Sequence, residues 1–118
     1  MGGSQGADPS PAEGYSITVR RAAEKDTQEA AGWYEEEHEG LGFTFLEKVG
    51  VAISRLRNTP YRHPEVIPGT RRMQVQGFPY WVYYTIRGNV VQVFAIVHER
   101  RRESVWRRRA PRVRKQDL

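Results

Sequence analysis

The spacing of hydrophobic positions changes from helical to alternating about halfway along the chain. Residues 23–38 and 41–56 carry apolar or small side chains every three or four positions, which predicts two amphipathic helices. Gly40 separates them and is a plausible helix stop, so the two helices should form a hairpin. Short alternating runs at residues 15–20 and 71–75 predict one strand before the helices and one after them.

The strongest local pattern lies between Phe78 and His98. Two runs rich in aromatic and β-branched residues flank Gly88-Asn89, which is typical of a two-residue β-hairpin turn. This turn predicts one face that packs on the helices, with the pairs Ile86–Val91, Tyr84–Val93, Val82–Ala95 and Tyr80–Val97. The opposite face is predicted to stay open and to carry Trp81, Tyr83, Thr85, Gln92, Phe94, Ile96 and His98.

The predicted element order is β-α-α-β-β-β, an α+β fold in which the helical hairpin packs on one face of a small, four-stranded antiparallel sheet. The folded domain should span residues 15–109, with a disordered tail at 1–14 and a basic disordered tail at 110–118. Three of the seven prolines fall between residues 60 and 68, so residues 61–69 are expected to form a loop. Residues 103–109 predict a last helical turn.

Positive charge is concentrated at the end of the chain. Residues 98–118 contain nine Arg or Lys and three Asp or Glu. The first 97 residues contain ten Arg or Lys and eleven Asp or Glu. This asymmetry favours an acidic or nucleic-acid partner there, and the alternative is a solvated basic tail. The chain has no cysteine, so no disulfide or thiol chemistry is expected, and no motif predicts a metal or a cofactor. With neither a signal peptide nor a membrane-spanning run, a cytoplasmic location is expected.

Several local motifs, in this order and spacing, resemble the RelE/ParE toxin superfamily of type II toxin–antitoxin systems. They are Leu41-Gly42 with Phe45-Leu46, Arg71-Arg72, Phe78-Pro79-Tyr80, Val82-Tyr83-Tyr84, the run 93–98, Arg101-Arg102 and Trp106. The resemblance covers residues 15 to about 109. It implies a plasmid-stabilisation type of growth inhibitor that a cognate antitoxin neutralises. The ParE branch is associated with poisoning DNA gyrase, and the ribonuclease branch cleaves mRNA in the ribosome.

The chemistry of RNA cleavage separates the two branches. Cleavage through the 2′-hydroxyl requires a base, a proton donor and cations that stabilise the phosphate charge. Arg72 and Arg101 can supply cations, and His98 is the best acid/base candidate. The resemblance implies that ribonuclease members often use a tyrosine near the chain end, where this chain has Trp106, which lacks a hydroxyl. We therefore expect a ParE-like gyrase inhibitor, with a ribosome-dependent endoribonuclease as the alternative.

The surface expected to contact the target or a nucleic acid combines cations with aromatic rings. Its members are Arg71, Arg72, Trp81, Tyr83, His98, Arg100, Arg101, Arg102 and Trp106. Simpler roles exist for several of them: His98 could cap its strand, Arg71 and Arg72 could pair with the acidic first helix, and the arginines after His98 could keep a sheet edge soluble. A third hypothesis for the whole chain is a non-toxic module that only binds a partner.

Overall fold

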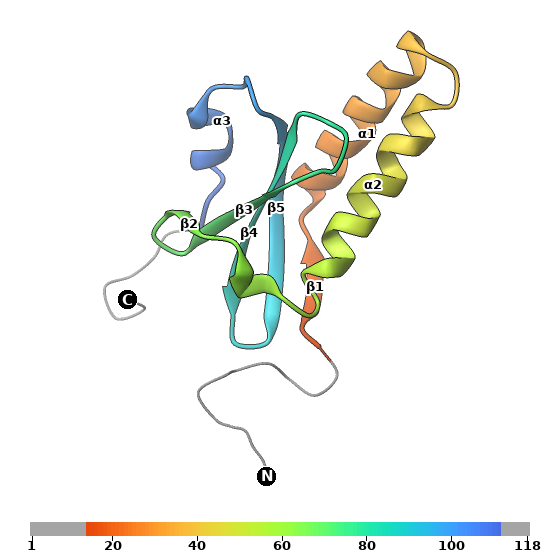
Figure 1. Ribbon diagram of the computed structural model, residues 1–118. Coiled ribbons are helices and arrows are strands. Elements are labelled where there is room, and N and C mark those ends of the chain that lie inside the picture. Colours follow the sequence, from red (N-terminus) through yellow and green to blue (C-terminus); the bar gives the residue numbers. More distant parts are fainter. Residues whose placement is uncertain (1–13, 112–118) are drawn as a thin grey trace.

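The computed structural model describes residues 14–111, which form a five-stranded sheet with the two long helices side by side on one face (Figure 1). The elements are β1 (Ser16–Val19), α1 (Arg21–Glu37), α2 (Leu41–Arg55), the 3-10 helix η1 (Pro60–Arg62), β2 (Glu65–Ile67), β3 (Thr70–Gln74), β4 (Tyr80–Arg87), β5 (Val90–His98) and α3 (Glu103–Arg107). The predicted α+β class and the helical hairpin on the sheet are confirmed. The predicted tails fall almost wholly outside the described residues.

The sheet differs from the prediction in two respects. Its strand order is β1-β5-β4-β3-β2, and β1 pairs with β5 in parallel rather than antiparallel fashion. The parallel pairing follows from the helical hairpin, which returns the chain to its starting end: the Tyr15 amide donates to the Arg57 carbonyl at 2.8 Å. The second difference is β2, a three-residue edge strand in the segment predicted to be a loop.

The β4–β5 hairpin keeps the predicted register only near its turn. Tyr84 faces Val93 as predicted, but the next residue of β4, Tyr83, pairs with Ala95. The residue between these partners, Phe94, is therefore the extra residue of a β-bulge. Sequence alternation cannot reveal such an insertion, because both strands keep their apolar character on either side of it.

The bulge exchanges the faces of the last residues of β5. Ala95 and Val97, predicted to pack under the helices, lie instead in a second apolar cluster on the opposite face. Ile96, predicted to be on the open face, is buried in the main core with the helices. His98 is likewise moved to the helical face. It pairs with Tyr80, and the centres of the two rings are 5.2 Å apart.

The main core lies between the helical hairpin and the sheet. Its fully buried large side chains include Phe45, Leu56, Val82, Tyr84 and Val93. Met73 and Val75, which are on one side of the alternating run 71–75, point into this core. Within residues 14–111, no helix is long and apolar enough to span a membrane.

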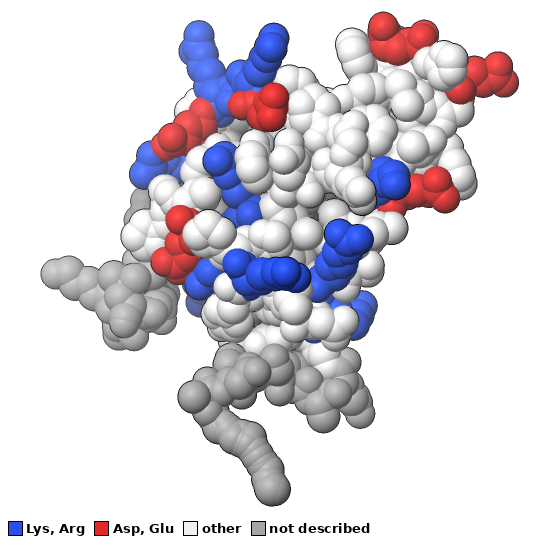
Figure 2. All heavy atoms as spheres, viewed as in Figure 1, with Lys and Arg blue, Asp and Glu red and all other residues white. Residues whose placement is uncertain are grey.

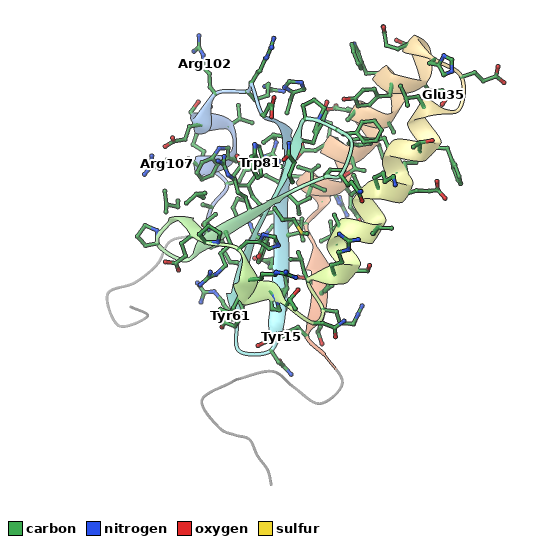
Figure 3. The ribbon with its side chains drawn as sticks, in the orientation of Figure 1. Tyr15, Glu35, Tyr61, Trp81, Arg102 and Arg107 are labelled. Carbon is green, nitrogen blue, oxygen red and sulfur yellow. The ribbon has the colours of Figure 1, made fainter. Side chains whose placement is uncertain are left out.

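The two helices touch most closely near their connection. A Cβ added to Gly42 would lie 2.5 Å from the Ala31 carbonyl oxygen, so only glycine fits there. The carboxylate of Glu35, labelled in Figure 3, accepts hydrogen bonds from the amides of Gly40 at 2.9 Å and Gly42 at 3.0 Å. Glu35 of α1 thus caps the first turn of α2, where negative charge is also favoured by the helix dipole.

Two glycines of α2 provide a matched test of this packing. Gly42→Ala should lower the free energy of unfolding by about 2 kcal/mol, because the methyl group forces the helices apart. Gly50 has no atom within 4 Å of an added Cβ, so Gly50→Ala should instead stabilise the protein by about 0.5 kcal/mol. Urea denaturation followed by circular dichroism measures both. Equal effects of the two substitutions would contradict the close helix contact.

The buried phenol of Tyr84 predicts a loss of stability in alkali. Its hydroxyl donates to the Pro60 carbonyl at 2.6 Å, and burial raises its pKa from 10.0 to about 12, against the opposing effect of Arg71. Above pH 10 the unfolded phenol ionises while the folded one stays neutral, so this stabilisation holds below pH 10 and is lost as pH rises through about 12.

Tyr84→Phe removes this dependence and should cost about 1 kcal/mol at neutral pH, since the Pro60 carbonyl loses its donor. Urea titrations of both proteins between about pH 8 and pH 11 measure the difference in unfolding free energy. That difference should shrink above pH 10. A constant difference across the range would show that Tyr84 titrates normally.

Candidate functional site

The face of the sheet opposite the helical hairpin holds a cluster of one arginine and three aromatic rings: Arg72, Trp81, Tyr83 and Trp106. We refer to it as the aromatic cluster. The Arg72 guanidinium carbon lies 3.9 Å from the centre of the Trp81 ring, a cation–π contact. Arg72 also donates from Nη1 to the Tyr83 hydroxyl at 3.3 Å. Four of the predicted contact residues are thus brought together in this cluster.

This face is not open as predicted, because residues 103–110, which we call the C-terminal segment, cover part of it. The Trp106 ring stacks on Tyr83 with centres 4.5 Å apart and planes at 16°. Trp106 is 6% exposed and Tyr83 2%. Figure 1 shows α3 on the side of the sheet away from α1 and α2. The aromatic cluster is therefore a packed second core whose edge, at Arg72 and Trp81, is partly accessible.

A bidentate ion pair holds this segment in place. Arg109 donates to the Asp26 carboxylate of α1 at 2.6 Å and 3.1 Å, and its Nη1 also reaches the Phe94 carbonyl at 3.4 Å. The same carboxylate accepts the Ile96 amide at 3.0 Å. Asp26 therefore joins α1, the bulged end of β5 and the residues after α3.

His98 is separated from the aromatic cluster by the sheet. It lies beside α1 in a shallow hollow whose other members are Asp26, Glu29, Ala30, Trp33, Tyr80, Ile96, Val97 and Arg101. Its Nδ1 accepts the Arg100 amide at 3.0 Å, as in the simpler expectation that it caps its strand. Burial raises the pKa of Tyr80 in this hollow; Arg101 opposes that shift and Asp26 adds to it. The prediction that His98 shares the open face with Trp81 is therefore wrong.

The other arginines of the predicted contact surface lie in two places. Arg71 points to η1 and the residue that follows it, where it donates to the carbonyls of Tyr61 and His63. Arg100, Arg101 and Arg102 occupy the exposed connection between β5 and α3, and Arg102 points away from the sheet (Figure 3). Among residues 14–111, neither Arg71 nor Arg72 forms the ion pair with the first helix that was one of the alternatives.

Sequence reasoning missed Asp26, Arg109 and Trp33. Asp26 looks like one of many acids on the solvent side of an amphipathic helix, and its partner is 83 residues away. Trp33 is 56% exposed, although tryptophan at this spacing would ordinarily be core. The flanking acidic run 35–37 was the only available sign that this part of α1 faces solvent.

Residues 17–103 match the sequence profile of a family described as the ParE toxin of the type II toxin–antitoxin system parDE. The chain belongs to this ParE toxin family. Trp106 and Arg109 lie beyond the matched residues.

A solved structure shows the same fold. A chain of the structure titled "Chromosomal ParDE TA system from P. aeruginosa" aligns with a TM-score of 0.55 and 16% sequence identity. The alignment covers 74% of this chain and 98% of that one. A search of curated proteins gives no significant match.

The role of the Asp26–Arg109 pair in this ParE-family chain can be measured directly. Asp26→Ala removes the ion pair and the acceptor of the Ile96 amide, and should lower the free energy of unfolding by about 3 kcal/mol. Glu29→Ala, on the next turn of α1 and exposed, should change it by less than about 0.5 kcal/mol. Urea denaturation provides both values, and similar losses in the two variants would refute the structural role of the pair.

Proposed function

We propose that this chain is the toxin of a type II toxin–antitoxin pair that arrests growth by inhibiting DNA gyrase. Membership of the ParE family supports the toxin assignment. The choice of gyrase rests on one observation: the groups needed for RNA cleavage do not converge. His98 lies on the helical side of the sheet, whereas Arg72 lies on the other side and is stacked on Trp81.

The aromatic cluster provides no substitute for a catalytic acid and base. Trp106 has no hydroxyl and is buried against Tyr83. The Tyr83 hydroxyl is beside Arg72, but the ring is buried and cannot stack on an incoming base. A ribonuclease would need this segment to move and a proton carrier from elsewhere. These features favour inhibition by binding over inhibition by cleavage.

We further propose that a cognate antitoxin binds along the hollow between α1 and the end of β5. There Trp33 is 56% exposed, so a partner that covers it would bury a large aromatic ring. β1 pairs with β5 only as far as Val93, so within residues 14–111 the rest of that edge has no neighbouring strand. Asp26 and Arg109 already occupy backbone groups of Ile96 and Phe94 there. An antitoxin segment would therefore bind mainly by burying Trp33 rather than by adding a strand.

Supercoiling assays with purified DNA gyrase test the proposed target. Added full-length protein should reduce the ATP-dependent supercoiling of relaxed plasmid, and mRNA in a translating extract should stay intact. A co-purified product of the neighbouring reading frame should restore supercoiling if it is the antitoxin.

The endoribonuclease alternative makes the opposite prediction for the same two assays. Unchanged supercoiling together with cut mRNA would show that the target is the ribosome and not gyrase. In that case Arg72→Ala and His98→Ala should each abolish cleavage. Growth arrest with neither effect would contradict both mechanisms.

A further inference from the structure

A second concentration of positive charge lies at the end of the molecule away from the tip of the helical hairpin. We call it the η1 patch, and it consists of Arg55, Arg57, Tyr61, Arg62, Arg71 and Arg87. Figure 2 shows blue side chains across the lower part of the molecule, where α2 ends and η1 follows, with red ones mostly elsewhere. Between residues 48 and 98 the sequence has seven Lys or Arg and one acid, Glu65.

Short contacts bring three separate segments to this end. The Tyr15 amide donates to the Arg57 carbonyl at 2.8 Å, which places the end of α2 beside the start of β1. The Ser16 amide donates to the Asn89 carbonyl at 2.8 Å, which adds the β4–β5 turn that follows Arg87. The rings of Tyr15 and Tyr61 meet edge to face with centres 6.2 Å apart, which adds η1.

Tyr61 presents an aromatic surface in the middle of these arginines. It is 47% exposed, and the Arg71 guanidinium lies over its ring at 5.1 Å from the centre. Arg71 also donates to the carbonyls of Tyr61 and His63, so the loop carrying the ring is held in position. Figure 3 shows Tyr61 at the surface near Tyr15. The ring is therefore preorganised rather than flexible.

Among residues 14–111, no cation of the patch forms an ion pair, although Glu65 stands opposite Arg71 in the β2–β3 pairing. The ion pairs among residues 14–111 are Arg107–Glu103 and Arg109–Asp26, and neither involves the patch. The carboxylate of the nearest acid in sequence, Glu65, accepts the Gly69 amide at 3.0 Å. Burial lowers the pKa of His63, and the neighbouring cations Arg62 and Arg71 lower it further.

We propose that the η1 patch binds single-stranded nucleic acid, with its arginines on the phosphates and Tyr61 stacked on an unpaired base. Guanidinium groups bind phosphate oxygens in pairs, and an accessible ring accepts any base that is not already stacked in a duplex. An acidic peptide would use the arginines but would leave Tyr61 without a planar partner. The two features together favour nucleic acid.

Fluorescence anisotropy with a labelled oligothymidylate of roughly 12 nucleotides tests this proposal on the full chain. Binding should weaken with salt, with a slope of log K against log salt of about −2 if three phosphates are neutralised. The triple variant Arg57→Ser, Arg62→Ser, Arg87→Ser should lose at least about tenfold in affinity. The matched control Arg100→Ser, Arg101→Ser, Arg102→Ser removes the same charge elsewhere and should lose about twofold or less.

The contribution of the ring is tested separately. Tyr61→Ser should weaken binding by about tenfold and Tyr61→Trp should restore it. Circular dichroism melting of each variant confirms that it is folded.

Three results would overturn the proposal. Equal losses in the two triple variants would show that only net charge matters. A duplex that binds as tightly as the single strand would exclude base stacking. Competition by polyglutamate at equal charge would indicate an acidic protein partner. The titration contains no gyrase, so its outcome is independent of the proposed target.

Discussion

The Asp26 carboxylate is the interaction on which the arrangement of this molecule most depends. Its two oxygens accept hydrogen bonds from the Ile96 amide and from both terminal nitrogens of Arg109. Backbone groups on the edge of β5 after the bulge at Phe94 lie beyond the end of β1, where no strand of the described part of the chain pairs with them. Buried or partly buried backbone groups need partners. Asp26 and Arg109 supply them, and in doing so they fix the C-terminal segment to the helical layer.

The position of that segment determines what the second sheet face can do. With Arg109 held, α3 lies where Trp106 stacks on Tyr83, and the face becomes a second core. A face closed by packing cannot also receive and align an RNA strand. The charged groups left accessible are at the rim, in the turn after β5 and around η1, and they suit binding rather than catalysis. This geometry is consistent with the proposed inhibition by binding rather than by RNA cleavage.

The sequence predicted the elements well because each depends on local spacing. The stripes of α1 and α2, the Gly88-Asn89 turn and the inward pair Met73 and Val75 all follow from periodicity. The sequence-based prediction was wrong where one inserted residue in a strand, or an ion pair between distant residues, determines which face a side chain occupies or covers. The bulge at Phe94 moved His98 to the helical face, and the Asp26–Arg109 pair closed the face predicted to be open. Both depend on contacts between segments that alternation and composition do not encode.

Charge is separated along the molecule in a way that suits more than one partner. Acids gather on α1 and at the hairpin tip, whereas arginines occupy the turn after β5 and the η1 patch (Figure 2). The hollow at Trp33 lies on the acidic side and the η1 patch at the opposite end of α2. Exposed charges separated by more than about 10 Å are largely screened at physiological salt. A partner in the hollow and a polyanion on the η1 patch would therefore bind with little mutual repulsion or attraction, unless one of them displaces the segment held by Arg109.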